Sequence, residues 1–164
     1  MHKNHKNMSN TNMSDNGHSH YRHLLIMAML SFIAMYILMY AMVNTLDNVY
    51  NNFNQLYMAG LMAAPMVLIE LFVMRSMYQD KRLNTIIIAG SVIVGLVFFL
   101  LIRQQTAISD RQFLRSMIPH HSGAILMCEQ ASIQDPEIQS LCASIVESQQ
   151  EEIDQMEVIL QRLE

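Results

Sequence analysis

Charged side chains are scarce in this chain. Only 15% of its 164 residues are charged, whereas 52% are hydrophobic. The charged residues between positions 24 and 102 are Asp47, Glu70, Arg75, Asp80, Lys81 and Arg82. A soluble domain needs more charge than this on its surface, so the composition excludes an ordinary soluble protein and predicts an integral membrane protein.

Patterns typical of several functional classes are also missing. The sequence has no phosphate-binding loop and no nucleophile with a partnered base, so we expect no enzymatic activity. The net charge is -4 and acidic residues gather between Glu129 and Glu164, which argues against a nucleic-acid partner.

Three hydrophobic segments interrupt the polar sequence, at residues 24–43, 56–74 and 83–102. At about 1.5 Å per residue, each helix covers the roughly 30 Å hydrocarbon core of a bilayer. The first segment is too long for a signal peptide and has no small-residue cleavage site, so it is expected to remain as an anchor. We predict a three-helix transmembrane region over residues 24–105, surrounded by membrane lipid.

Basic residues flank these segments unevenly. Lys3, Lys6 and Arg22 precede the first segment. Arg75, Lys81 and Arg82 lie in the second loop, between the second and third segments. The first loop, residues 44–55, has none. Because basic loops stay on the cytoplasmic side, we expect a cytoplasmic N-terminus and an extracytoplasmic C-terminal part.

The N-terminal tail, residues 1–23, is rich in Asn and Ser and is predicted to be disordered. It holds five of the seven histidines, His2, His5, His18, His20 and His23. Such a tail can chelate metals weakly without fixed geometry, although a plain solvated tail is the simpler interpretation.

Residues 106–164 are predicted to form two helices. The first begins near Ser109 or Asp110, and the second begins at Asp135, an N-cap residue that is followed by proline. The connection is short, which favours an antiparallel hairpin. A two-helix hairpin buries only one stripe, so we expect a homo-oligomer, with two hairpins forming a four-helix bundle.

Helical spacing predicts one contact seam on each helix of the hairpin. The seams comprise Phe113, Met117, His120, Ala124, Met127 and Ala131 on the first helix, and Ile138, Cys142, Ile145, Gln149, Glu152, Met156, Ile159 and Leu163 on the second. Folding at the turn is expected to bring His120 near Gln149 and Met117 near Glu152.

A metal site is one interpretation of this polar midpoint. Thioether and imidazole groups suit a soft ion such as Cu(I), and the carboxylate or amide of the second helix can complete the site. The candidate ligands are Met117, His120, His121, Met127, Glu152 and Met156, with Gln149 as a further candidate. The alternative is that the histidines form hydrogen bonds within the bundle and the methionines fill its core. A di-iron site is disfavoured because neither helix carries Glu-x-x-His.

The two cysteines, Cys128 and Cys142, occupy facing positions of the predicted hairpin. A disulfide, two free buried thiols and an additional pair of metal ligands all remain open at this point.

The second hydrophobic segment carries a stripe of methionines around a carboxylate, Met58, Met62, Met66 and Glu70. An intramembrane carboxylate is costly and usually marks a functional site, so the stripe could carry monovalent copper. Alternatively the methionines are apolar filling, and Glu70 reaches water near the end of its helix.

The C-terminal half resembles the bacterial family called domain of unknown function 305. The resemblance covers residues 106–164, about a third of the chain. It rests on Phe113-x3-Met117-Ile118-Pro119-His120-His121-x2-Ala124-Ile125-x-Met127, Asp135-Pro136-x-Ile138 and Gln149-x2-Glu152-Ile153-x2-Met156. The preceding part of the chain, with its three hydrophobic segments, looks similar to the membrane-anchored members of this family. The cysteines depart from the family pattern, in which small residues are expected.

This resemblance implies a ferritin-like four-helix fold, location in the bacterial cytoplasmic membrane with a periplasmic C-terminal domain, and, for some members, copper binding and copper tolerance. Its candidate positions are Met117, His120, His121, Met127, Gln149, Glu152 and Met156. We therefore expect a membrane-anchored copper-binding protein of metal homeostasis. The alternatives are a protein similar to the trimeric copper uptake transporters and a purely structural oligomerisation module.

Overall fold

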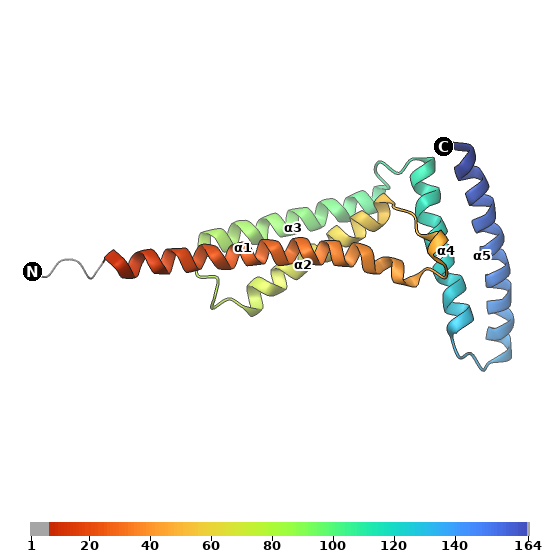
Figure 1. Ribbon diagram of the computed structural model, residues 1–164, viewed down its shortest axis with the longest axis horizontal. Coiled ribbons are helices and arrows are strands. Elements are labelled where there is room, and N and C mark those ends of the chain that lie inside the picture. Colours follow the sequence, from red (N-terminus) through yellow and green to blue (C-terminus); the bar gives the residue numbers. More distant parts are fainter. Residues whose placement is uncertain (1–6, 164) are drawn as a thin grey trace, which may run out of the picture. The chain divides into compact units, whose positions relative to one another are not determined.

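The computed structural model describes the backbone of residues 7–163 and the side chains of residues 19–163. Within this range the secondary structure is entirely helical, with no strand, as predicted (Figure 1). The elements are α1 (Asn7–Leu38), the short 3-10 helices η1 (Met39–Met42) and η2 (Leu46–Asn48), α2 (Phe53–Val73), α3 (Lys81–Gln104), α4 (Asp110–Gln130) and α5 (Pro136–Leu163).

The chain divides into two compact units. One, here called the apolar unit, combines the stretch up to Met35 with Met58–Arg103. The other, here called the C-terminal unit, combines Tyr36–Tyr57 with the chain from Gln104 onward. The first loop, residues 44–55, was assigned to the transmembrane region from the sequence, but in the structure it packs with the C-terminal helices.

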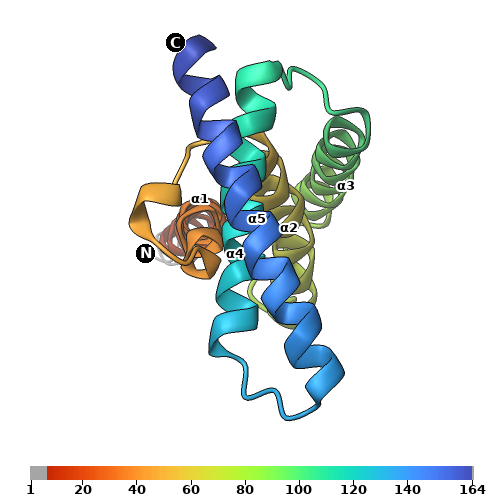
Figure 2. The same cartoon turned by 90° about the vertical axis from the view of Figure 1, so that its right-hand side faces the viewer.

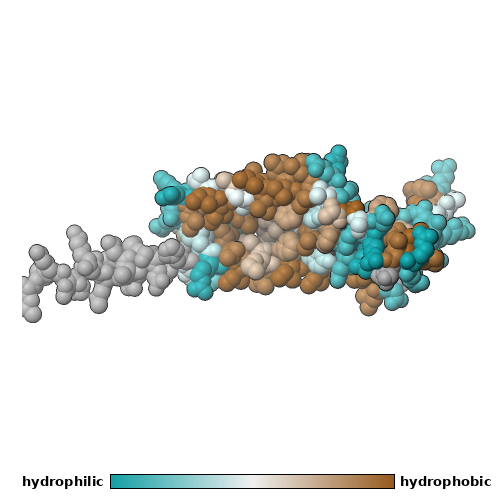
Figure 3. Space-filling view, turned by 90° about the horizontal axis from the view of Figure 1, so that it is seen from above, coloured by the Kyte–Doolittle hydropathy of each residue, from teal (hydrophilic) through white to brown (hydrophobic). Residues whose placement is uncertain are grey.

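Three helices are long and apolar enough to cross a membrane, over Ser19–Met42, Phe53–Val73 and Lys81–Gln104. They overlap the three predicted segments. Their large apolar side chains are widely exposed, for example Leu25 at 62% and Phe72 at 75%. Figure 3 shows this hydrophobic surface in brown. Surfaces of this kind are rarely left in water, which is consistent with contact with lipid.

Helix α1 begins earlier than predicted. Residues 7–23 were expected to be disordered, but α1 extends back to Asn7. A helix already nucleated in the apolar segment can lengthen without the cost of a new first turn, so weakly helical residues can join it. The remaining tail residues, 1–6, including His2 and His5, lie outside the described range.

Local capping explains where α3 and α5 begin. The Asp80 carboxylate accepts hydrogen bonds from the backbone N–H groups of Arg82 and Leu83, at 2.9 and 3.0 Å. The Asp135 carboxylate does the same at the start of α5, where it accepts a hydrogen bond from the backbone N–H of Glu137 at 2.9 Å. These contacts satisfy donors that have no partner inside a helix, so both helix starts are fixed by sequence.

Helices α4 and α5 lie side by side and run in opposite directions (Figures 1 and 2). Their shared core is a cluster of buried apolar side chains. Its members are Leu114, Ile118 and Ile125 on α4, and Ile153, Met156 and Leu160 on α5. This core and its surroundings position the candidate site.

Proline 119 lies inside α4 without ending it. Proline has no N–H, so the carbonyl of Arg115, one turn earlier, loses its usual helical partner. The side-chain amide of Asn52 donates to that carbonyl at 3.4 Å, and Asn52 itself is buried. The first loop therefore supplies the partner that the helix lacks.

Candidate functional site

The face that α4 turns toward α5 differs from the predicted seam by one residue. The structure buries Leu114, Ile118, His121 and Ile125. By contrast, Phe113 of the predicted seam is 50% exposed. One residue is a rotation of about 100° around a helix, so His121 replaces His120 as the histidine at the α4–α5 contact.

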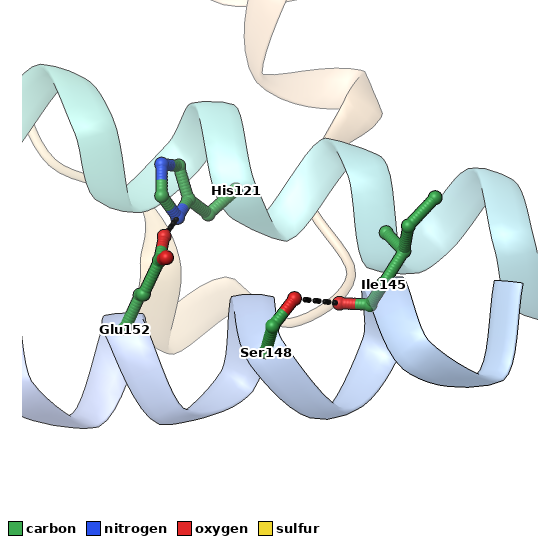
Figure 4. Close-up of polar contacts among 4 residues, drawn as sticks. All are labelled: His121, Ile145, Ser148 and Glu152. Carbon is green, nitrogen blue, oxygen red and sulfur yellow. Dashed lines mark hydrogen bonds and ion pairs between the residues drawn. The ribbon is translucent and has the colours of Figure 1, made fainter. Parts of the chain in front are cut away.

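His121 is buried, and its Nδ1 lies 3.0 Å from Oε2 of Glu152 on α5 (Figure 4). The Glu152 side chain is half exposed, at 52%. The contact has the distance of an ion pair but not the direction of a hydrogen bond, since Nδ1 has no hydrogen-bond partner within the described part of the chain. A buried nitrogen in this condition is uncommon and calls for a functional explanation.

Burial lowers the pKa of His121 below its ordinary value of 6.5. Glu152 opposes this shift by attracting the proton, and the neighbouring His120 adds to it. Desolvation dominates because a charged imidazolium loses its hydration inside the contact. At neutral pH the ring is therefore neutral, which is the form that binds metal ions.

Two thioethers lie one turn from this pair. Met156, four residues after Glu152, is buried at 8% exposure, and Met117, four residues before His121, packs partly buried against the same core. Because α4 and α5 run in opposite directions, these two positions are level with each other. The structure thus gathers an imidazole, a carboxylate and two thioethers on adjacent turns.

The remaining predicted ligands are not gathered there. His120 is exposed, with its ring centre 6.1 Å from that of His121, and Met127 is 55% exposed. Gln149 is half-buried one turn along α5 from Glu152. Among the described residues no three His, Cys, Asp or Glu side chains form a metal-binding group, so a metal at His121 requires the thioethers.

Cys128 and Cys142 form a disulfide between α4 and α5, with their Cα atoms 5.3 Å apart. Of the three alternatives that the sequence left open, the structure selects this one. In the oxidised protein neither cysteine offers a thiolate to a metal. Structural disulfides persist in oxidising compartments and are rare in the cytosol.

The methionine stripe of α2 is not collected around an inward-facing site. Met58 and Met62 are 40% and 47% exposed, and Met66 and Glu70 are half-buried. The pKa of Tyr78, in the loop after α2, is raised first by burial and then by the nearby charge of Glu70. Glu70 therefore lies at the loop end of α2.

The docking of the first loop on α4 was not found from the sequence. The backbone N–H of Asn44 donates to Ser122 Oγ at 2.7 Å, and that hydroxyl donates to Asn44 Oδ1 at 2.6 Å. At Gly123 an added Cβ would lie only 3.3 Å from the Met42 carbonyl oxygen. The two small residues that follow His121 were the available signal, because they permit such a close approach.

Part of this chain matches a known family. The family described as Domain of unknown function (DUF305) matches residues 99–160. A protein named "Uncharacterized protein L153", from Acanthamoeba polyphaga mimivirus, is 35% identical over 140 residues, which covers 84% of this chain and 90% of the viral protein. No solved structure shows significant similarity to the chain.

Proposed function

We propose that this chain, which belongs to the DUF305 family, binds a copper ion between α4 and α5. The observation that carries the proposal is the buried Nδ1 of His121, which faces Glu152 without a hydrogen bond. An imidazole held neutral by burial needs no deprotonation before it binds a metal. Met117 and Met156, one turn away, are the matching soft ligands.

The donor set favours copper over other common ions. Thioethers select Cu(I), while imidazole and carboxylate oxygen suit Cu(II), so the four side chains can serve either oxidation state. Magnesium and calcium prefer sites made entirely of oxygen ligands. The role that follows is metal binding in homeostasis, with no chemical step catalysed by the protein.

We further propose that the three apolar helices anchor this site to a membrane, with the C-terminal unit on the exported side. Three observations support this placement. The helices are long enough to span, basic residues gather in the second loop, and the disulfide fits an oxidising compartment. The related viral protein gives no reason to restrict the membrane to bacteria.

The test is copper titration of the full chain in detergent, purified without a histidine tag. Cu(I) is titrated against a competing chelator, and the His121→Ala and His120→Ala variants are compared. We expect His121→Ala to weaken binding at least tenfold, because it removes the central ligand. The exposed His120 is the matched control, and its variant should bind within about threefold of the unaltered chain.

Two outcomes would contradict the proposal: no stoichiometric copper binding, or equal effects of the two variants. If His121→Ala lowers only the melting temperature and leaves copper binding unchanged, the histidine serves packing alone. The structural alternative predicts that last result.

A further inference from the structure

Helix α4 carries two adjacent apolar rows; the inner row lies in the core shared with α5, and the outer row packs against that core only at Met117. The inner row faces α5. Each residue of the outer row precedes a residue of the inner row by one position. The outer row, with alternating spacings of four and three residues, consists of Phe113, Met117, His120, Ala124 and Met127. Its residues Phe113 and Met127 are 50% and 55% exposed. A regular alternation of four and three is typical of a helix seam that packs against another helix.

Helix α5 carries a corresponding outer row, again one residue before its inner row. Ile138 and Leu141 in this row are 48% and 58% exposed, Ile145 and Ile159 are half-buried, and Glu152 lies near the middle. On both helices the outer row lies one residue before the inner row. In an antiparallel pair, two rows displaced in this way lie on the same face of the pair. On α5 the outer row is polar from Ser148 through Glu152 to Gln155, so the face of the α4–α5 pair has two apolar ends separated by a polar band that includes His120.

We propose that a second copy of this chain covers this face, with α4 of each copy against α5 of the other. The segment from Asn44 to Asn54 forms hydrogen bonds with α4 at Arg115, Ser116 and Ser122, none of which belongs to the outer row. Two copies related by an axis parallel to the helices form a four-helix bundle in which neighbouring helices alternate in direction.

The charges of the two helices favour this orientation of a second copy over the one in which α5 packs on α5. Helix α5 has six acidic residues, Glu137, Glu147, Glu151, Glu152, Asp154 and Glu157, against one basic residue, Arg162. Helix α4 has two of each sign and two histidines. Packing α5 on α5 would bring like charges together, whereas packing α4 on α5 avoids this repulsion.

In this arrangement the polar band of one copy lies opposite the polar band of the second copy. Rotation about an axis parallel to the helices keeps each residue at its own level, and His120 and Glu152 are at nearly the same level. His120 of one copy then lies opposite Glu152 of the second copy, and apolar ends meet apolar ends. The interface would also shield Glu152, which is half exposed in the single chain. The inference extends the proposed copper site but does not require a metal.

The test is the mass of the full chain in detergent, measured by light scattering for two charge-introducing variants. Met127→Glu places a carboxylate on the outer row. Val158→Glu is the matched control, because Val158 is 67% exposed on a different side of α5. We expect the unaltered chain and Val158→Glu to be dimers of the 18.9 kDa chain, and Met127→Glu to dissociate at least tenfold more readily.

A cross-linking experiment separates this interface from any association of the apolar helices. Chains with His120→Cys are mixed with chains with Glu152→Cys, and disulfide-linked pairs are counted against a mixture in which Val158→Cys replaces the second variant. We expect linkage only in the first mixture. A monomeric unaltered chain, equal linkage in both mixtures, or equal dissociation of the two glutamate variants would overturn the inference. Copper titration of the same samples shows separately whether the metal site has failed.

Discussion

At the residue scale, two adjacent histidines have opposite surroundings. His121 is buried against α5, whereas His120 faces outward. A dipeptide of identical residues thus yields one buried side chain and one exposed side chain. Helical spacing had placed His120 on the predicted seam, because a helical repeat does not show which of two neighbouring positions faces a partner helix.

The buried histidine predicts a dependence of stability on pH. Its pKa in the folded chain is below 6.5, so as the pH falls the unfolded chain takes up the proton first. The contribution of the neutral His121 to the free energy of unfolding is therefore fully present above pH 6.5. It declines as the pH falls from 6.5 toward the folded-state pKa. We expect the melting temperature in detergent to be lower at pH 5.5 than at pH 7.5.

The variant His121→Gln should lose part of this decline, because glutamine does not titrate. His120→Gln serves as the control and should retain most of the decline, because burial lowers the pKa of His121 more than the neighbouring His120 does. Melting curves of the metal-free proteins, followed by helical circular dichroism, measure the difference. Identical pH profiles for the two variants would show that His121 is not the group responsible.

At the element scale, α4 shows what the sequence could and could not predict. Its start at Asp110 and the Asp135 cap of the following helix were predictable, because capping is local. Its rotation was not. The outer row around Phe113 and the inner row around Leu114 are similarly apolar, so hydrophobic spacing does not show which row α5 covers.

The first loop was also beyond prediction from the sequence. Its contacts with α4 join residues 78 positions apart, Asn44 and Ser122, through polar groups that have no periodicity. Asn52 pairs with a carbonyl that is available only because Pro119 follows one turn later. Such pairings depend on tertiary structure, and the candidate site was therefore only partly predictable.

The Asn44–Ser122 contact predicts a local effect of one hydroxyl. Ser122→Ala removes both hydrogen bonds to Asn44 and leaves a backbone N–H without its partner, at a cost of about 1–3 kcal/mol. We expect the amides of residues 42–48 to exchange hydrogen at least about fivefold faster, since about 1 kcal/mol corresponds to that factor. Hydrogen exchange followed by mass spectrometry measures it.

Ser148→Ala is the matched control for this prediction. The Ser148 hydroxyl donates to the Ile145 carbonyl at 3.2 Å within the exposed part of α5 (Figure 4). Its loss leaves no buried group unpaired, so exchange in the first loop should be unchanged. If the two variants behave alike, the hydroxyl of Ser122 does not hold the loop on α4.

At the scale of the whole molecule, the loop contact constrains how the chain can cross a membrane. Residues 44 and 122 touch, so they must lie on the same side. Between them the chain contains two helices apolar enough to span, α2 and α3, and two crossings return it to its starting side. If both helices cross, the loop between α2 and α3 lies on the opposite side, together with the basic residues Arg75, Lys81 and Arg82 in and next to that loop.

This arrangement is testable with single engineered cysteines, because both native cysteines are held in a disulfide. Leu46→Cys and Val158→Cys replace side chains that are 87% and 67% exposed, and Ser76→Cys lies in the loop after α2. We expect a membrane-impermeant maleimide to label the first two positions on intact cells, and Ser76→Cys only after permeabilisation. Labelling of Leu46→Cys and Val158→Cys from opposite sides would contradict the paired crossing of α2 and α3. If only Ser76→Cys were labelled on intact cells, the orientation would be reversed and the proposed copper site would face the cytoplasm.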